Sequence, residues 1–366
     1  MTMKILLIAI LFACSALATA GEDMSVSEFI AETGVREGQV AMRDRPGWNA
    51  TPTIVVRHRS GITDDLEMAI PGATIIAVSS VAEALALDVS ADIFLGMCNA
   101  EAVDEANELV WVQVFSSGVE RCMGAQAITN GDVVLTNMQK MSSPAIGEHA
   151  VAMMLSLARG LPRFAKAMPD GRWRRDLAAQ PGMVTVDGKT VLVVGLGGIG
   201  SEVAKRAKAL GMRVTATRNS SREGPPFVDY VGLSDELIEL AANADFVVNA
   251  LPLTSTTAGL LDRGFFGELK DGAYFVNVGR GGTVVTDALL EALQEGRLAG
   301  AGLDVTDPEP LPADHPLWQM PNVIITPHVS SSGANRLLHR TLLRENLRRY
   351  VAGEALLNVV DPERGY

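Results

Sequence analysis

Three residues in the C-terminal half of the sequence could together move a proton and hold a small anion. Arg280 stands in "NVGRGG", Glu309 in "GLDVTDPEPL" and His328 in "TPHVSSSG", each past an apolar run that predicts a strand. A histidine beside a carboxylate can donate and accept protons near neutral pH, and a guanidinium fork suits a planar carboxylate. Because parallel strands end at one edge of a sheet, we expect these side chains to face a common crevice.

The stretch "VLVVGLGGIG" has glycines at the spacing of a dinucleotide-binding turn. Gly195, Gly197 and Gly200 follow a continuous apolar strand and open a predicted helix from Ile199 to Leu210. Such glycines allow a tight turn, close approach of a pyrophosphate and close packing of helix on sheet. The helix N-terminus attracts the phosphates. A glycine turn used for packing alone is the weaker interpretation, because the strand and the helix are both in place.

The next predicted strand ends in "TATRNSS", where many NAD-binding folds have an acidic residue that binds the ribose. Arg218 stands eighteen residues after Gly200, close to the roughly twenty expected for that acidic residue. Arginine instead attracts a 2′-phosphate and can stack on adenine. The residues that follow offer small donors and a second cation: Asn219, Ser220, Ser221 and Arg222. The pattern predicts that NADP is preferred and NAD possible; the alternative is a solvent-facing Arg218, with NAD bound through other contacts.

Strands and helices alternate in two blocks, which predicts an α/β fold with parallel sheets. The first block has predicted strands at 53–58, 74–79, 91–96 and 109–115. The second has them at 189–195, 212–217, 244–251, 272–279, 300–305 and 322–328. Between the blocks, a helix that Ser143 can cap, ended by Gly160, is apolar nearly all round, as is typical of a helix buried between two bodies. A final helix over about 334–352 closes the first block, so the second unit is inserted into the first.

The N-terminal twenty residues predict a cleaved signal peptide. Lys4 precedes an apolar run, and Ala18-Thr19-Ala20 forms a cleavage signal before Gly21. We therefore expect a periplasmic or secreted protein, or a cytoplasmic one if the start is misassigned. No other stretch is long and apolar enough to span a bilayer, so no membrane association is expected in the mature form. Residues 21–50 are mostly polar and are expected to be loosely ordered.

Composition and cysteine content limit the class of protein and the partners it could bind. The 366 residues suffice for two domains, and 48% apolar with 20% charged residues is ordinary for a globular protein. A net charge of −12 argues against a nucleic-acid partner. Cys98 and Cys122 lack metal-ligand spacing, and no metal is expected. Two buried thiols are the favoured interpretation, although these cysteines could pair in an oxidising compartment.

Six motifs in order, "GLGGIG", "ALPLT", "NVGRGG", "AGLDVTDPEPLP", "HPLW" and "NVIITPHVS", resemble the D-isomer-specific 2-hydroxyacid dehydrogenase family over roughly 53–358, in its glyoxylate/hydroxypyruvate reductase-like form. The resemblance implies a Rossmann dinucleotide-binding domain inserted into a flavodoxin-like substrate domain, and a homodimer across the long helix. The expected divisions are a signal peptide at 1–20, a leader at 21–50, a substrate domain at 51–150 with 332–366, and an NAD(P)-binding Rossmann domain at 151–331.

The resemblance also implies NAD(P)-dependent interconversion of a small 2-oxo acid and a D-2-hydroxy acid. Arg280 would bind the substrate carboxylate and carbonyl, His328 would be the acid/base, and Glu309 would hold His328. Backbone N–H groups near the substrate carboxylate would come from Met97, Cys98, Gly118 and Val119, with ordinary sheet-edge loops as the alternative. Cofactor contacts would come from Gly195, Gly197, Gly198, Ile199, Gly200, Arg218, Asn219, Ser220, Leu251, Pro252, Thr257, Val278, Gly279, Arg280, Asp304 and His328.

Two other functions are less consistent with the sequence. A 3-phosphoglycerate-type dehydrogenase needs a phosphate site, and the loops of the first unit show no basic cluster. A non-catalytic NAD(P)-binding sensor or corepressor would have no need of Arg280, Glu309 and His328 together. A cofactor titration followed by a panel of 2-oxo acids separates the three possibilities.

Overall fold

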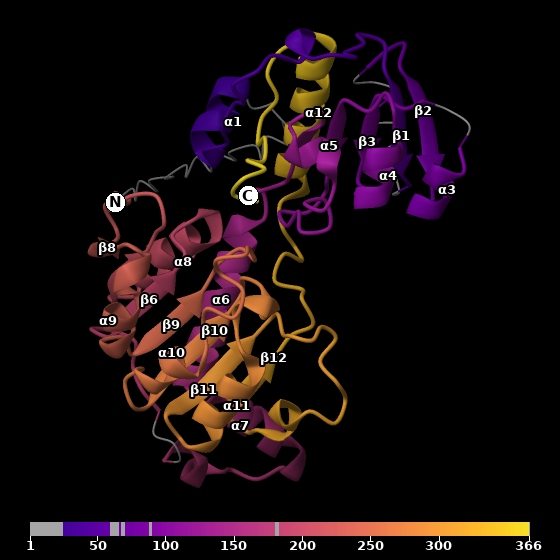
Figure 1. Ribbon diagram of the computed structural model, residues 1–366. Coiled ribbons are helices and arrows are strands. Elements are labelled where there is room, and N and C mark those ends of the chain that lie inside the picture. Colours follow the sequence, from indigo (N-terminus) through magenta and orange to yellow (C-terminus); the bar gives the residue numbers. More distant parts are fainter. Residues whose placement is uncertain (1–24, 59–65, 67–69, 88–89, 180–182, 366) are drawn as a thin grey trace, which may run out of the picture.

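The structure, a computed structural model, describes residues 25–58, 66, 70–87, 90–179 and 183–365. Two parallel sheets form two α/β units, a smaller one and a larger one, joined where the chain crosses between them (Figure 1). This confirms the predicted fold class. The predicted signal peptide, residues 1–20, lies outside the described residues.

The smaller sheet has the strand order β2-β1-β3-β4-β5, which is the order of flavodoxin-like folds. Its strands are β1 (Thr53–Arg57), β2 (Thr74–Val78), β3 (Ile93–Leu95), β4 (Trp111–Gln113) and β5 (Val134–Thr136). Its connecting helices include α3 (Val81–Leu85), α4 (Ala100–Glu105) and α5 (Gln126–Thr129). The sequence analysis predicts four of these strands and does not predict β5.

Residues 25–50, expected to be loosely ordered, are instead packed onto the smaller unit. Helix α1 (Val26–Thr33) buries Phe29 completely. Trp48 Nε1 donates to the carbonyl oxygen of Tyr350 at 2.8 Å. The buried apolar residues of the segment are widely spaced: Phe29, Val35 and Met42. Since they form no regular period, the pattern of the sequence does not reveal them.

The last helix, α12 (Arg336–Val351), returns to the smaller unit as predicted. Leu342 and Leu347 are buried in the same cluster as the strands of the smaller sheet. The ring of Tyr350 stacks on that of Trp111 with centroids 5.6 Å apart. The larger unit is therefore inserted between β5 and α12 of the smaller one (Figure 1).

The larger sheet has the order β12-β11-β10-β9-β6-β7-β8. Its strands are β6 (Thr190–Val194), β7 (Arg213–Thr217), β8 (Tyr230–Gly232), β9 (Phe246–Asn249), β10 (Ala273–Asn277), β11 (Leu298–Leu303) and β12 (Val323–Ile325). Its helices include α7 (Leu161–Ala167), α8 (Gly198–Ala209), α9 (Leu237–Ala242), α10 (Arg263–Gly267) and α11 (Thr286–Gln294). Short 3₁₀ helices lie at Met42–Asp44, Met168–Asp170, Arg175–Ala178, Ser234–Glu236, Gly281–Thr283 and Pro316–Gln319. The sequence predicts every one of these strands except the three-residue β8.

Helix α6 (Ser143–Ala158) covers one face of the larger sheet instead of lying between the two units. Its residues Met153 and Met154 are buried in the core of the larger unit, whereas Ala152 is exposed. The N-cap is Ser142, one residue before the predicted one, and its side chain does not cap the helix. One side of α6 therefore packs on the larger sheet, and the other side, which includes Ala152, is uncovered.

Candidate active site

The residues predicted to do chemistry follow the carboxyl ends of neighbouring strands of the larger sheet. The chain runs from β6 outward through β7 to β8, then crosses to β9 on the other side of β6. In open α/β sheets a ligand binds beyond the strand ends at such a switch point. The glycine turn follows β6, while Leu251 and Pro252 follow β9. The sheet thus has a switch point where the sequence predicts a dinucleotide to bind.

The glycine turn has the geometry that a pyrophosphate needs. Gly195 has φ +95°, a conformation that side chains disfavour. A Cβ on Gly200 would lie 2.1 Å from the carbonyl oxygen of Gly195, so helix α8 packs directly on the turn. A Cβ on Gly197 would meet no atom within 4 Å, which leaves that side of the turn open. The first N–H groups of α8, including those of Gly198 and Ile199, have no partner within the helix. These groups fit a dinucleotide phosphate.

Arg218 directly follows β7, with Asn219 and Ser220 exposed after it. Its Nη1 donates to the carbonyl oxygen of Glu223 at 2.8 Å, which folds the arginine over its own loop. Arg222, the expected second cation, is already paired with Glu236 at 2.5 Å. Of the two arginines, Arg218 is the one left to meet a ligand anion.

A buried amide network holds the loop that carries Arg280. Asn249 Nδ2 donates to Asn277 Oδ1 at 2.9 Å and to Thr283 Oγ1 at 2.8 Å. The Thr283 hydroxyl donates to the carbonyl oxygen of Arg280 at 2.7 Å, and the N–H of Gly279 donates to Asn277 Oδ1. The sequence does not predict this network, although both of its asparagines end apolar strands. It fixes the backbone at Val278 and Gly279 beside the crevice.

The guanidinium of Arg280 reaches across to the smaller unit. Its Nε donates to Glu120 Oε1 at 2.7 Å, and its Nη1 donates to the carbonyl oxygen of Gly279 at 2.9 Å. A Cβ on Gly118 would lie only 2.1 Å from Nη2, so the glycine is what allows this approach. The structure therefore brings Arg280 together with the predicted Gly118. Glu120 is a further residue of the site. In the sequence it could have been found as the carboxylate of "SSGVER", which follows the predicted strand at 109–115.

His328 and Glu309 form the predicted pair. The distance from His328 Nδ1 to Glu309 Oε1 is 2.7 Å, and about half of each side chain is exposed. His328 has a left-handed backbone with φ +53°, which is uncommon for a residue with a side chain. With Nδ1 on the carboxylate, Nε2 is the ring nitrogen available to a substrate.

Asp304, expected to contact the cofactor, is 2% exposed and holds the turn around His328. Its carboxylate accepts from Thr326 Oγ1 at 2.6 Å, from the N–H of Val329 at 2.9 Å and from the N–H of Ser330 at 3.1 Å. Burial acts to raise the pKa of the Asp304 carboxyl, but these hydrogen bonds outweigh it and leave the pKa below its usual value. A buried carboxylate thus organises the turn.

Thr257, also expected to contact the cofactor, uses its hydroxyl within its own loop. The hydroxyl donates to the carbonyl oxygen of Pro252 at 2.6 Å and accepts from the N–H of Thr254 at 2.8 Å. Hydrogen bonds between its own residues therefore hold the loop after β9 together, and Leu251 and Pro252 lie near its start.

The two substrate loops of the smaller unit follow β3 and β4, which are neighbours in the sheet. Cys98 in the first loop and Cys122 after the second form a disulfide, with Cα atoms 5.4 Å apart. The expectation of two buried thiols is therefore wrong, because adjacent parallel strands bring their outgoing loops side by side. Met97 and Val119 are buried, whereas Cys98 and Gly118 beside them are partly exposed.

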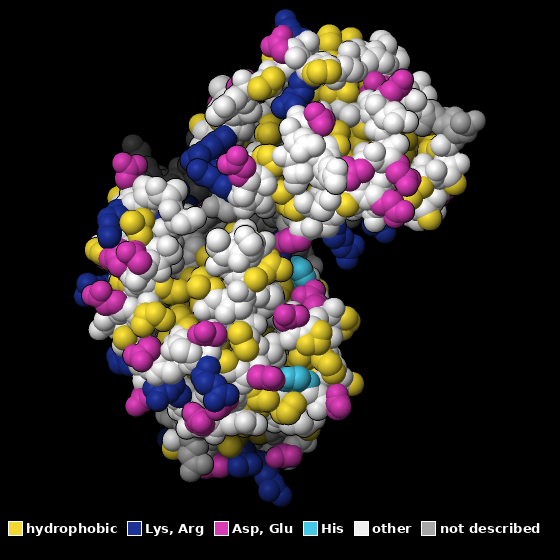
Figure 2. Space-filling view, in the orientation of Figure 1, with side chains coloured by type: hydrophobic (Ala, Val, Ile, Leu, Met, Phe, Trp, Pro, Cys, Tyr) yellow, Lys and Arg dark blue, Asp and Glu magenta, His cyan; other side chains and the backbone are white. Residues whose placement is uncertain are grey.

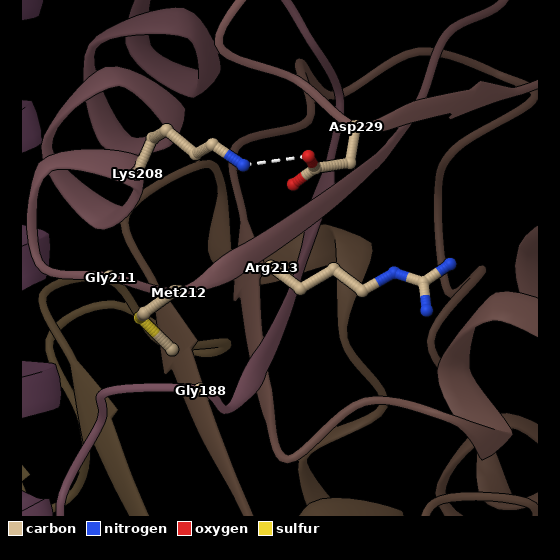
Figure 3. Close-up of a pocket in the computed structure, with 6 residues that line it drawn as sticks. All are labelled: Gly188, Lys208, Gly211, Met212, Arg213 and Asp229. Atoms are coloured by element: carbon tan, nitrogen blue, oxygen red, sulfur yellow. Dashed lines mark hydrogen bonds and ion pairs between the residues drawn. The ribbon is translucent and has the colours of Figure 1, made fainter.

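A hollow elsewhere on the larger unit lies away from these residues. It is lined by Gly188, Lys208, Gly211, Met212, Arg213 and Asp229 (Figure 3). Arg213 begins β7, so the hollow is at the amino ends of the strands, opposite the crevice. The ion pair from Lys208 Nζ to Asp229 Oδ1, 2.6 Å long, crosses it.

Other site types find little support among the residues that the structure describes. They contain no cluster of three or more metal-ligating side chains and no helix suited to crossing a membrane. On the face shown in Figure 2, basic side chains are scattered among acidic ones.

Known proteins with the same sequence features are oxidoreductases. Residues 151–330 match the family described as D-isomer specific 2-hydroxyacid dehydrogenase, NAD binding domain. The chain is 34% identical over 272 residues to a glyoxylate reductase of Korarchaeum cryptofilum, covering 72% of this chain and 80% of that protein. It is 33% identical over 270 residues to a D-3-phosphoglycerate dehydrogenase of Archaeoglobus fulgidus, covering 72% of this chain but only 49% of that protein. The chain thus spans about half the length of that relative.

A solved structure agrees with both units. It is that of a D-isomer specific 2-hydroxyacid dehydrogenase from Xanthobacter autotrophicus in complex with NADPH and MES. The two folds match with a TM-score of 0.75 and 30% identity, covering 86% of this chain and all of that one. With these relatives and with its two inserted parallel-sheet units, the chain belongs to the D-isomer specific 2-hydroxyacid dehydrogenase family.

Proposed function

We propose that this protein is an NAD(P)-dependent oxidoreductase that interconverts a small 2-oxo acid and its D-2-hydroxy acid, of the glyoxylate or hydroxypyruvate kind. The observation that carries the proposal is the pairing of His328 with Glu309 at 2.7 Å, on the same sheet edge as Arg280. The three residues follow β12, β11 and β10, which are neighbours in the sheet. The similarity to a glyoxylate reductase supports the substrate class.

Arg280 orients the substrate. Its Nε–H donates to the carboxylate of Glu120, and one N–H of Nη1 donates to the carbonyl oxygen of Gly279. Nη2 and the second N–H of Nη1 remain as donors for the substrate carboxylate and keto oxygen. A cation at the keto oxygen favours the negative charge that develops there during reduction.

His328 supplies the proton. In reduction the protonated imidazole delivers its Nε2 proton to the keto oxygen as that oxygen becomes a hydroxyl; in oxidation the neutral ring accepts the hydroxyl proton. Glu309, bound to Nδ1, stabilises the imidazolium and orients the ring. A bound nicotinamide supplies or accepts the hydride at C2.

NADP(H) is the preferred cofactor in this proposal. The turn at Gly197 and the start of α8 would hold the pyrophosphate, and Arg218 would face the adenine ribose. A relative of the same fold was solved with NADPH, which supports this preference. Leu251, Pro252 and Val278 would flank the nicotinamide half, because they follow β9 and β10 at the switch point.

The phosphoglycerate alternative is favoured by the similarity to D-3-phosphoglycerate dehydrogenases. The loops after β3 and β4 weigh against it, since residues 96–99 carry no cation and Arg121 is adjacent to the carboxylate of Glu120. A phosphate there would meet a negative charge. A small uncharged substituent on C2 of the substrate suits these loops better.

A fluorescence titration with NADH and NADPH, followed by a panel of 2-oxo acids, tests the proposal. We expect binding of both cofactors, tighter for NADPH, and turnover of glyoxylate or hydroxypyruvate. Turnover limited to 3-phosphohydroxypyruvate would support the alternative. Cofactor binding without turnover of any 2-oxo acid would favour a sensor and contradict the proposed activity.

We also propose the domain boundaries and the homodimer that the sequence predicts. The substrate domain would comprise 51–150 and 332–366, the NAD(P)-binding domain 151–331, and the uncovered side of α6 would join two copies into a homodimer. The signal peptide at 1–20 would direct export to the periplasm or outside the cell. The disulfide of Cys98 and Cys122 supports export, since disulfides persist in oxidising compartments.

A further inference from the structure

Lys140 connects the N-terminal segment to the glycine turn. It lies just before α6 and has a left-handed backbone with φ +75°. Its Cγ is 3.2 Å from where a Cβ on Gly198 would stand, so its stem lies against the first residue of α8. Its Nζ donates to the carbonyl oxygen of Gly34. The protonated lysine ammonium has three N–H donors, so two remain beyond this bond.

Three cations from distant parts of the chain gather at this place. Arg36 follows Gly34 by two residues, and Arg218 directly follows β7, which contacts α8. Burial, together with the charges of Arg36 and Arg218, lowers the pKa of the Lys140 amine from its usual value. Like charges held together destabilise the fold unless an anion joins them.

Neighbouring cations are paired with carboxylates, whereas no ion pair joins Arg36, Lys140 or Arg218 to a carboxylate among the residues that the structure describes. Arg222 pairs with Glu236, and Arg206 on α8 pairs with Glu202 and Glu148. Within the described part of the chain, the acidic residue nearest in sequence to Arg36 is Glu37, which pairs with Arg349 at 3.1 Å. The charges of Arg36, Lys140 and Arg218 are therefore available to a ligand.

We propose that Arg36 and Lys140 join Arg218 to form the site for the 2′-phosphate of NADP(H), so that residues 34–36 close over the adenosine end of the cofactor. This proposal rests on the NADP preference proposed above. The elements flanking the three cations are the end of β7 and the start of α8, which bracket the adenosine half of a dinucleotide in this type of fold. A ribose phosphate carries nearly two negative charges and three acceptor oxygens, which suits three cationic donors.

Equilibrium binding tests this site without turnover. The variants are Lys140→Gln and Arg36→Gln, and the matched controls are Lys208→Gln and Arg213→Gln at the hollow of Figure 3. The Kd values for NADPH and NADH are measured by nicotinamide fluorescence, and those for 2′-AMP and 5′-AMP by calorimetry. Arg36 is exposed, so its variant gives a reading even if Lys140→Gln fails to fold.

We expect Lys140→Gln to weaken the binding of NADPH and of 2′-AMP about tenfold, because a charged hydrogen bond is lost. Arg36→Gln should weaken the binding of both ligands about threefold. In both variants, the Kd values for NADH and 5′-AMP should change less than twofold. In the control variants, the Kd values for all four ligands should change less than twofold. Equal weakening of NADPH and NADH would assign these cations to the pyrophosphate and overturn the proposal. So would unchanged NADPH affinity in both variants, or a parent protein that binds 2′-AMP no better than 5′-AMP. Failure to reduce any 2-oxo acid would instead count against the proposed activity, because no binding measurement depends on it.

Discussion

The carboxylate of Asp304 accepts hydrogen bonds from the two backbone N–H groups that directly follow His328, those of Val329 and Ser330. The backbone carbonyl of Asp304 also accepts from the N–H of His328 at 2.8 Å. One buried residue thus holds both ends of a turn whose central φ is positive. The position of the imidazole depends on a carboxylate that never touches it.

Replacing Asp304 with Asn should lower both stability and turnover. The amide can still accept through its oxygen, but its NH₂ then faces the backbone N–H of Ser330. The loss should be about 1–3 kcal/mol at pH 7, the usual cost of an unsatisfied buried donor. Urea unfolding measures it. Because the folded pKa of Asp304 is lowered, its contribution is present above the unfolded pKa and is lost as the pH falls through the folded pKa. The difference between parent and variant should therefore shrink toward acid pH; a constant difference would contradict this role.

Replacing His328 with Asn should leave cofactor binding nearly intact and lower kcat by about 10²–10⁴, the range for a general acid–base residue. Glu309→Gln should move the pH optimum for reduction downward, because the imidazolium loses the carboxylate that stabilises it. Steady-state rates across pH provide the measurement. An unchanged pH profile for Glu309→Gln would rule out the assigned pairing.

Arg280→Lys keeps the charge but loses the planar fork that Glu120 and Gly279 hold in place. We expect kcat to fall and KM to rise, with kcat/KM lower by about tenfold or more, as for the loss of a charged hydrogen bond. Glu120→Gln, the companion variant, keeps the shape and weakens the contact to Nε. If Arg280→Lys behaves like the parent, the substrate carboxylate binds elsewhere.

Arg218→Asp should swing cofactor preference toward NADH. A charged hydrogen bond to phosphate contributes roughly 1.5–3 kcal/mol, so the preference for NADPH should fall by at least about tenfold. Fluorescence titration of both cofactors measures the ratio. A parent that binds NADH as tightly as NADPH, with no change in the variant, would show that "TATRNSS" is not a phosphate pocket.

Export predicts a processed N-terminus. Mass spectrometry of protein from its native host should find a chain that begins at or near Gly21, because Lys4, the apolar run and Ala18-Thr19-Ala20 form a signal peptide pattern. A chain that begins at Met1 or Met3 and fractionates with the cytoplasm would contradict export.

Much of the active-site edge could be predicted from the sequence because its information is local. The glycines after β6, Arg280 after β10 and His328 after β12 each follow an apolar strand. Parallel strands end on one edge, so their sequence positions place these residues together. The helix that follows the glycine turn begins within one residue of its predicted start.

What the sequence determined by itself is therefore the kind of fold, the edge that carries the chemistry and the residues that end its strands. Tertiary structure alone decided the contacts between distant segments: Glu120 with Arg280, Cys98 with Cys122, and Lys140 with Gly34. It also decided that Asp304 is buried and that residues 25–50 share a core with α12. Short-range periodicity reports which face of an element is buried. Pairing across 24 residues, as for the two cysteines, or across 160, as for Glu120 and Arg280, depends on which strands are neighbours and on where the chain crosses over. No local pattern records that.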